Sequence, residues 1–403
     1  MHGNEVKMIK IIKVESKRIL SKRVFLMFVV MVFLFSAFST YLSLRHYMVL
    51  NADGTIVTWQ ENLAHARTNQ QGKAIDREQL SFMREKDEFI YIDETSMNEI
   101  VRLNYEGKLI QELTDEEIGS FYQTRLSRIR DMLEENQYIQ YTQEEKEYFL
   151  QKASQLSEIP FSYAEGWKIL NKDMSTFVSL LIVFISVLLI PIFGSDPKVS
   201  MKELYRSTRY GKKTLDTARI LTAFIVGSVL YFGGISLFFV IKMIPFGLDG
   251  AMQYIQSNMT TFFSVFSMTY LQQFFTNVAV GFIALFFDVC LLILITVVMD
   301  KIMNSAVVFV FFWITLLLFD QMYIWKVNHY FANFMPLRLT NFSHYYIGNE
   351  IYRICGISFS VLSWSILLSG LLAGVMLILA IELQKVKRKR YVKLIDGMLN
   401  NKR

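Results

Sequence analysis

Six apolar runs constrain the fold of this 403-residue chain more than any other feature of its sequence. They lie at approximately 24–44, 176–194, 219–242, 273–299, 304–324 and 359–382. Each run is long enough to cross ~30 Å of bilayer hydrocarbon at a rise of ~1.5 Å per residue. Because a backbone in lipid must satisfy its hydrogen bonds within its own segment, all six are predicted to be helices. A content of 53% hydrophobic residues also indicates a membrane protein.

Charge is distributed unevenly between the segments that flank these runs. Residues 1–23 carry seven Lys/Arg against two acids, residues 196–219 seven against three, and residues 384–403 eight against one. Cytoplasmic segments are enriched in Lys and Arg, so these three are predicted to be cytoplasmic. Residues 46–172 carry 14 Lys/Arg against 23 acids, a net charge of −9, and are predicted to lie outside. The overall charge of +6 therefore requires no nucleic-acid partner.

These features predict an all-α membrane protein with six transmembrane helices and a mainly helical extracellular domain between spans one and two. The first run lacks a following small-residue cleavage site, which indicates an uncleaved signal-anchor. The predicted parts are a cytoplasmic amphipathic helix (1–23), span one (24–45), the extracellular domain (46–175), span two (176–195), a cytoplasmic segment (196–218), spans three to six (219–383) with outside loops 243–272 and 325–358, and a basic cytoplasmic tail (384–403).

The N-terminal helix is expected to lie in the headgroup region, with Ile9, Ile12 and Ile19 on one side and basic residues on another. The alternative is a plain extension of span one.

In the extracellular domain, Thr114 with Glu117 and Thr142 with Glu145 fit capping boxes that begin helices. The alternation in FIYID, residues 89–93, predicts a short strand. Aromatic residues of the two outside loops are expected to anchor the chain at the membrane interface; they include Trp325, Tyr330, Tyr345 and Tyr346.

The segment SMKELYRSTRYGKKTLDTARI, residues 200–220, is polar and basic although it lies between two apolar runs. Met201, Leu204 and Tyr205 have helical spacing, which predicts a short amphipathic helix with a small apolar patch suited to a groove on a partner. The alternative is a solvated loop whose charges only fix topology. Residues 211–214 resemble the end of a P-loop, but the preceding glycine and the preceding strand are missing, so ATP binding by this chain is not expected.

Asp288 lies near the middle of the fourth apolar run. An acid at the centre of a span costs ~2.5–3.5 kcal/mol on insertion scales, so it should face the bundle, a cavity or a subunit interface. One interpretation is a cavity or coupling residue, and the other is a protonated or hydrogen-bonded acid that serves packing. No cluster of His, Cys and carboxylates has metal-ligand spacing, so no metal site is predicted.

The run LYRSTRYGKKTLDTARI resembles the segment after the second span of ABC-2 type permeases, the membrane subunits of ABC exporters. The matching positions are Ser207, Thr208, Gly211, Lys212, Lys213 and Arg219, with Asp196 where many members have an acid and Ser200 where a glycine is frequent. FSYAEGWKIL, residues 161–170, resembles the stretch leading into the second span of Gram-positive peptide-type exporters. FMPLRLTNF, residues 334–342, resembles the Pro-containing loop between their last two spans.

This resemblance implies that the cytoplasmic helix is a coupling helix, which docks on a separate P-loop ATPase subunit. Met201, Leu204 and Tyr205 would then form the docking face, and Arg206 and Arg209 its polar rim. The chain would not be an enzyme by itself and would hold no cofactor, since ATP and Mg²⁺ would bind the ATPase. A second permease, the same chain or a different one, would complete an exporter in a bacterial plasma membrane with both termini cytoplasmic.

The substrates implied by the resemblance are hydrophobic or cationic peptides, including antimicrobial ones, or lipid-like compounds. The acidic outer domain would attract cationic peptides. A rival class is a non-transporting sensor or scaffold that recognises an extracellular ligand through residues 46–175. A third class, an intramembrane enzyme, predicts that a change at Asp288 abolishes activity while assembly is unchanged.

Overall fold

The computed structural model describes residues 2–50, 54–70, 72–193, 211–299, 301–322 and 324–400. These residues are predominantly helical, and they include six helices long and apolar enough to cross a membrane. The six are α2 (Lys22–Arg45), α9 (Glu165–Phe193), α11 (Gly211–Phe246), α12 (Tyr270–Met299), α13 (Ile302–Met322) and α17 (Val361–Asn400). Each coincides with one apolar run, so the prediction of six candidate spans in a mainly helical chain is confirmed.

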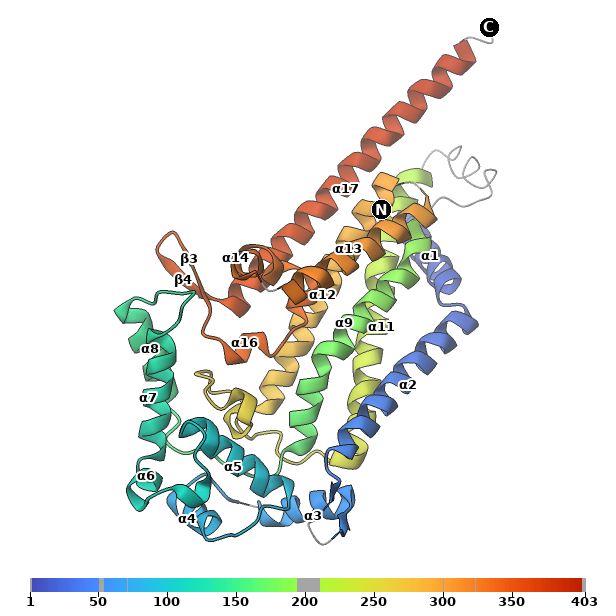
Figure 1. The fold of residues 1–403 in the computed structure, drawn as a ribbon. Helices are drawn as coiled ribbons and strands as arrows, with labels where there is room; N and C mark the ends of the chain where they lie inside the picture. Colours follow the sequence, from blue (N-terminus) through green and yellow to red (C-terminus); the bar gives the residue numbers. More distant parts are fainter. Residues whose placement is uncertain are drawn as a thin grey trace.

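The bundle is built around α9, α11 and α12, which pack against one another (Figure 1). In the most apolar window of each helix, 50% of residues are buried in α9 and 56% in α12, against 17% in α17. Helix α2 packs on α11 and α9, while α13 and α17 pack on α12. The stacked rings of Phe177 and Phe238, 4.1 Å apart, lie in the contact between α9 and α11.

Helix α9 begins at Glu165, eleven residues before the predicted start of span two at residue 176. The first part of this helix carries the polar residues Lys168, Asn171 and Asp173. Lys168 bonds to Glu165 of the same helix, whereas Asn171 donates to the Tyr270 carbonyl of α12 and Asp173 pairs with Lys242 of α11. A span can therefore include polar residues that the bundle itself satisfies.

Between α2 and α9 the described residues form a set of shorter helices. These are α3 (Trp59–Asn69), α4 (Arg77–Arg84), α5 (Ile92–Asn104), η1 (Ile110–Glu112), α6 (Asp115–Gly119), α7 (Phe121–Glu134) and α8 (Gln143–Ser154), after a short antiparallel pair of strands, β1 (Val49–Leu50) and β2 (Ile56–Val57). Both capping boxes, at Thr114 and Thr142, are present as predicted. We call residues 56–164 the helical domain.

The strand predicted at residues 89–93 is wrong, because α5 begins at Ile92 within that stretch. The carboxylate of Glu94 accepts hydrogen bonds from the backbone N–H groups of Ile90 (3.2 Å) and Tyr91 (3.3 Å). It thereby satisfies donors at the start of the helix, a local signal that outweighs the apolar and polar alternation of the sequence.

The loop between α11 and α12 completes the core of the helical domain. This loop contains η2 (Ile255–Ser257) and η3 (Met259–Thr261). The Arg125 side chain, on α7, is buried and donates hydrogen bonds to the carbonyls of Phe262 (3.0 Å), Ser264 (3.0 Å) and Ala153 (3.3 Å). Burial lowers the pKa of Arg125 to about 10, so its guanidinium is still charged at neutral pH. Segments more than 130 residues apart are thus joined through one side chain.

The segment between α13 and α17 folds back into the bundle. It comprises α14 (Trp325–Tyr330), η4 (Ala332–Phe334), α15 (Pro336–Leu339), α16 (His344–Ile347) and the antiparallel hairpin of β3 (Ile351–Ile354) and β4 (Ile357–Ser360). Tyr345 and Tyr346 are each 2% exposed, so the expectation that they anchor the chain at the membrane interface is wrong. Their rings pack in the main core, where Tyr346 bonds to Asn277 of α12 and the neighbouring α15 lies against α12 and α13.

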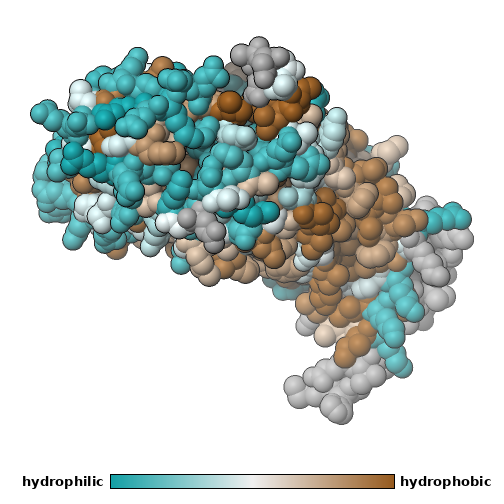
Figure 2. Space-filling view, turned by 90° about the horizontal axis from the view of Figure 1, so that it is seen from below, coloured by the Kyte–Doolittle hydropathy of each residue, from teal (hydrophilic) through white to brown (hydrophobic). Residues whose placement is uncertain are grey.

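The helical domain lies at one end of the bundle, which we call the domain end (Figure 1). The N-terminal helix α1 (His2–Ile19), the end of α9, the start of α11 and the last turns of α17 lie toward the opposite end, which we call the α1 end. In Figure 2 hydrophilic residues cover the domain and hydrophobic residues cover the visible spans. The surface therefore divides as expected for a bundle in lipid beside a domain in water.

Gly281→Ala is expected to destabilise the bundle, because a Cβ at this position of α12 would clash with the Tyr231 hydroxyl and lie 2.8 Å from Val178 Cγ1. Overpacking of this kind costs about 1–3 kcal/mol. Gly370→Ala on α17 is the control, since a Cβ there has nothing within 4 Å. Thermal unfolding of the purified chain in detergent should show a lower midpoint for the first variant only, and equal midpoints would contradict the close packing at Gly281.

Candidate functional site

The predicted ATPase-docking residues lie outside the described residues. Met201, Leu204, Tyr205, Arg206 and Arg209 all fall within 194–210, between the end of α9 and the start of α11. The last turn of α9 and the first turn of α11 both lie toward the α1 end of the bundle (Figure 1). The segment that carries the predicted docking face is thus attached at both ends to central helices.

Helix α1 is fixed to both helices that flank this segment. Glu15, which is 6% exposed, pairs with Arg219 of α11 and with Arg18, each at 3.0 Å. Arg18 also donates a hydrogen bond to the carbonyl of Pro191 in α9, at 3.0 Å. Of the predicted apolar side, Ile19 is buried in the main core whereas Ile9 is 63% exposed. A displacement of α9 or α11 at this end would therefore also move α1.

Asp288 is fully buried where α9, α12 and α13 meet. One carboxyl oxygen accepts a hydrogen bond from Ser186 Oγ at 2.6 Å, and the other accepts one from Trp313 Nε1 at 3.2 Å. Both donors come from helices other than its own. The carboxyl group thus joins three spans through neutral donors, which is the hydrogen-bonded arrangement that a buried polar group requires.

A second polar cluster, of residues Ser39, Ser43, Asp173 and Lys242, joins α2, α9 and α11. The Lys242 ammonium is completely buried and pairs with Asp173, and it also donates to Ser43 Oγ at 3.1 Å. The same carboxylate oxygen of Asp173 accepts hydrogen bonds from Ser39 (2.9 Å) and Ser43 (3.1 Å). We call this set the Lys242 cluster. Intramembrane charges that pair in this way are a feature of transport pathways and of interfaces between helices.

About two turns nearer the domain end than Asp173, Glu165 at the start of α9 accepts two further hydrogen bonds. They come from Lys168 Nζ at 2.7 Å and from Tyr47 Oη at 2.6 Å. Burial, together with the negative charge of Glu165, raises the pKa of Tyr47 well above its ordinary value. The Tyr47 hydroxyl therefore keeps its proton and acts as a donor, which fastens the end of α2 to α9.

On its remaining faces, α9 bonds to α12 and to the segment before α17. Asn171 accepts from Asn277 Nδ2 at 3.1 Å, and Asn277 in turn accepts from Tyr346 Oη at 2.7 Å. Ser179 and Thr340 share a hydrogen bond of 2.5 Å. The stretch 334–342, singled out in the sequence for its proline, thus inserts polar groups between the spans.

Asp288 could be identified from the sequence, whereas Asp173 and Lys242 were not predicted. Both charges lie at the margins of apolar runs, where a side chain can usually reach the interface, so neither was distinctive alone. The available signal was their combination: opposite charges at the same end of consecutive spans, with Ser175 and Thr176 shortly after Asp173. Within the described ranges, no group of His, Cys, Asp and Glu is arranged to hold a metal ion.

Comparisons of the chain with protein-family models, with curated proteins and with solved structures found no match in any of the three.

Lys242→Met is expected to destabilise the protein by about 3–5 kcal/mol, because it leaves the Asp173 carboxylate without its buried ammonium partner. Lys172→Met is the matched control, because Lys172 lies next to Asp173 on the same turn of α9 but its side chain is exposed. The double variant Asp173→Leu with Lys242→Met should recover most of the loss. Thermal unfolding in detergent measures all three, and a single variant as stable as the control would show that the pair contributes nothing.

Asp288→Leu is expected to lower stability by about 1–3 kcal/mol for each donor left unpaired at Ser186 and Trp313. Asp288→Asn retains a polar group of the same shape and should lie close to the wild type. The same unfolding assay compares them. If both variants lose equal stability, the ionised carboxylate itself is required, and the packing interpretation of Asp288 is wrong.

Proposed function

We propose that this chain is the membrane-spanning permease subunit of an ABC exporter, which works with separate P-loop ATPase subunits and a second permease. The observation that carries the proposal is that α9 ends, and α11 begins, toward the end of the bundle opposite the helical domain (Figure 1). In the sequence, residues 194–210 join these two central helices. A protein bound to this segment would act directly on the two helices that the rest of the bundle packs around.

The contacts of α9 explain how such a force would spread. Its Ser186 is bonded to Asp288 of α12, and its Asp173 is paired with Lys242 of α11. Its Glu165 is bonded to Tyr47, just beyond the end of α2. If an ATPase displaced α9, these three hydrogen-bonded contacts would be strained at the same time. The hypothesis is that the permease opens, by alternating access or lateral release, when these connections rearrange.

The orientation proposed from the charges would place the ATPase-binding segment on the cytoplasmic side of the membrane, where ATP is available. The basic segments 1–23, 196–219 and 384–403 would face the cytoplasm, and the helical domain would lie outside a bacterial plasma membrane. The net charge of −9 over residues 46–172 would draw cationic peptides toward the domain. We therefore propose a hydrophobic or cationic peptide, or a lipid-like compound, as the substrate class.

Purification of the full chain from its native membrane in mild detergent, with identification of the proteins that accompany it, tests the proposal. A P-loop ATPase should be recovered with the wild type. Leu204→Asp and Tyr205→Ala should reduce its recovery by at least about tenfold, the effect of roughly 1.4 kcal/mol at the docking surface. Glu203→Gln, on the opposite side of the predicted helix, should not.

Absence of an ATPase from the wild-type complex, with the chain intact and folded, would overturn the proposal. The non-transporting sensor or scaffold would then be favoured, and ligand binding by the helical domain would be the property to measure. Equal recovery of the ATPase with all variants would retain the complex but remove residues 201–209 as its docking site.

A further inference from the structure

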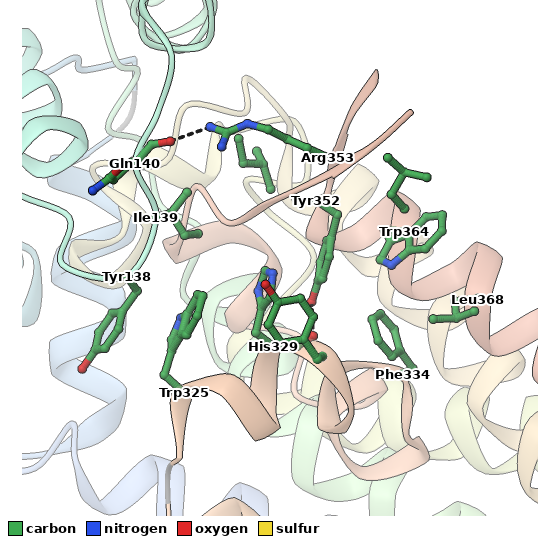
Figure 3. Close-up of a pocket in the computed structure, with 13 residues that line it drawn as sticks. Tyr138, Ile139, Gln140, Trp325, His329, Phe334, Tyr352, Arg353, Trp364 and Leu368 are labelled. Carbon is green, nitrogen blue, oxygen red and sulfur yellow. Dashed lines mark hydrogen bonds between the residues drawn. The ribbon is translucent and has the colours of Figure 1, made fainter. Parts of the chain in front are cut away.

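A pocket of about 460 Å³ lies outside the clusters described above (Figure 3). It is formed where the α7–α8 loop, α14, the β3–β4 hairpin and the first turns of α17 meet. Six aromatic side chains line it: Tyr138, Trp325, Tyr330, Phe334, Tyr352 and Trp364. Its volume lies within the range of about 300–1,000 Å³ that is typical of sites for small ligands.

One wall of the pocket is a continuous stack of rings. Tyr138 stacks on Trp325 at 5.5 Å, Trp325 on His329 at 4.8 Å, and His329 on Tyr352 at 4.2 Å. The Tyr352 hydroxyl donates to the His329 carbonyl at 2.7 Å and accepts from Asn333 Nδ2 at 2.8 Å. These contacts hold the wall in place, so the pocket is formed before any ligand binds.

The charges around the pocket are already paired with one another. Arg353 donates to Glu145 at 2.9 Å and to the Gln140 carbonyl at 2.6 Å. Behind the wall, Glu350 bonds to His329 and to His344. Burial acts to raise the pKa of Glu350, but the hydrogen bonds from the two imidazoles outweigh it and hold the pKa at about 2. A ligand of this pocket would thus find apolar and hydrogen-bonding surfaces but no uncompensated charge.

The lining changes from apolar to polar along the pocket. Trp364 and Leu368 belong to the first two turns of α17, which is a candidate span from Val361. Gln140 and Arg353 lie on the other side, toward the helical domain (Figure 3). The indole nitrogen of Trp364 points toward Tyr352 across the space, and no hydrogen bond of this N–H is recorded within the described residues. The Trp364 N–H, a hydrogen-bond donor, thus lies between the apolar part of the lining at Leu368 and the polar part at Gln140 and Arg353.

We propose that this pocket binds a glycerolipid from the adjacent leaflet, with an acyl chain against Phe334 and Leu368 and an ester carbonyl on the Trp364 indole N–H. A lipid matches the order of the lining, because its chain, ester and headgroup follow one another across the membrane interface. A cationic peptide matches less well, since Arg353 lies in the lining and no acidic side chain does. The lipid site goes beyond the permease function and does not depend on it.

The full chain in nanodiscs that contain phosphatidylglycerol with a photoactivatable diazirine in its acyl chain tests the proposal. Cross-links should map to residues 325–368 and should be competed by an excess of the same lipid without the diazirine. Leu368→Trp fills the pocket and should reduce this competable labelling about tenfold, equivalent to ~1.4 kcal/mol. Trp364→Phe keeps the ring but removes the N–H, and should reduce it roughly two- to tenfold, the effect of one hydrogen bond.

Leu367→Trp is the matched control, because Leu367 is 45% exposed and does not line the pocket, although it is adjacent in the same helix. Its labelling should equal that of the wild type. Labelling that excess lipid does not compete, or that is equal in the Leu367 and Leu368 variants, would indicate only bulk lipid contact and would overturn the proposal. Protection of the pocket by a hydrophobic peptide but not by lipid would also overturn it. No ATPase is present in this assay, so its outcome is independent of the proposed export function.

Discussion

The structure depends on one requirement, that each polar group carried by α9 into the bundle must find its partner there. A polar group buried without a hydrogen bond costs several kcal/mol in an apolar medium, and lipid supplies no water to compensate. Helix α9 meets this requirement with a different partner at each level, from Glu165 at one end to Ser186 near the other. The partners lie on or next to α2, α11, α12 and the segment before α17, so the position of each is fixed relative to α9.

This requirement also explains why the segment between α13 and α17 does not lie loosely on the membrane surface. Thr340 bonds to Ser179, and Tyr346 bonds to Asn277, so the segment supplies polar groups that α9 and α12 need. In return its aromatic rings are buried in the same core. The bundle is therefore completed by a stretch that is too polar and too short to be recognised as a span.

The sequence was sufficient to predict the six candidate spans and both capping boxes, because length, hydropathy and capping are local properties. It was insufficient for the start of α9 and for the burial of Tyr345 and Tyr346, because those depend on partners that are distant in the chain. Asp288 was recognisable since an acid amid apolar residues is conspicuous. Its donors, Ser186 and Trp313, could not be identified, because serine and tryptophan in a span have many ordinary uses. The aromatic pocket combines residues from four elements and has no linear pattern at all.

The contact of Arg125 with the loop between α11 and α12 has a consequence for biosynthesis. Phe262, whose carbonyl this side chain binds, is synthesised 137 residues after Arg125. At a synthesis rate of about 5–20 residues per second, on the order of ten seconds would pass between the synthesis of Arg125 and that of the segment that completes the core of the helical domain. During that interval its central arginine lacks two of its acceptors. The domain is thus the first large part to be made, but it cannot close until two more long helices, α9 and α11, have been synthesised and placed.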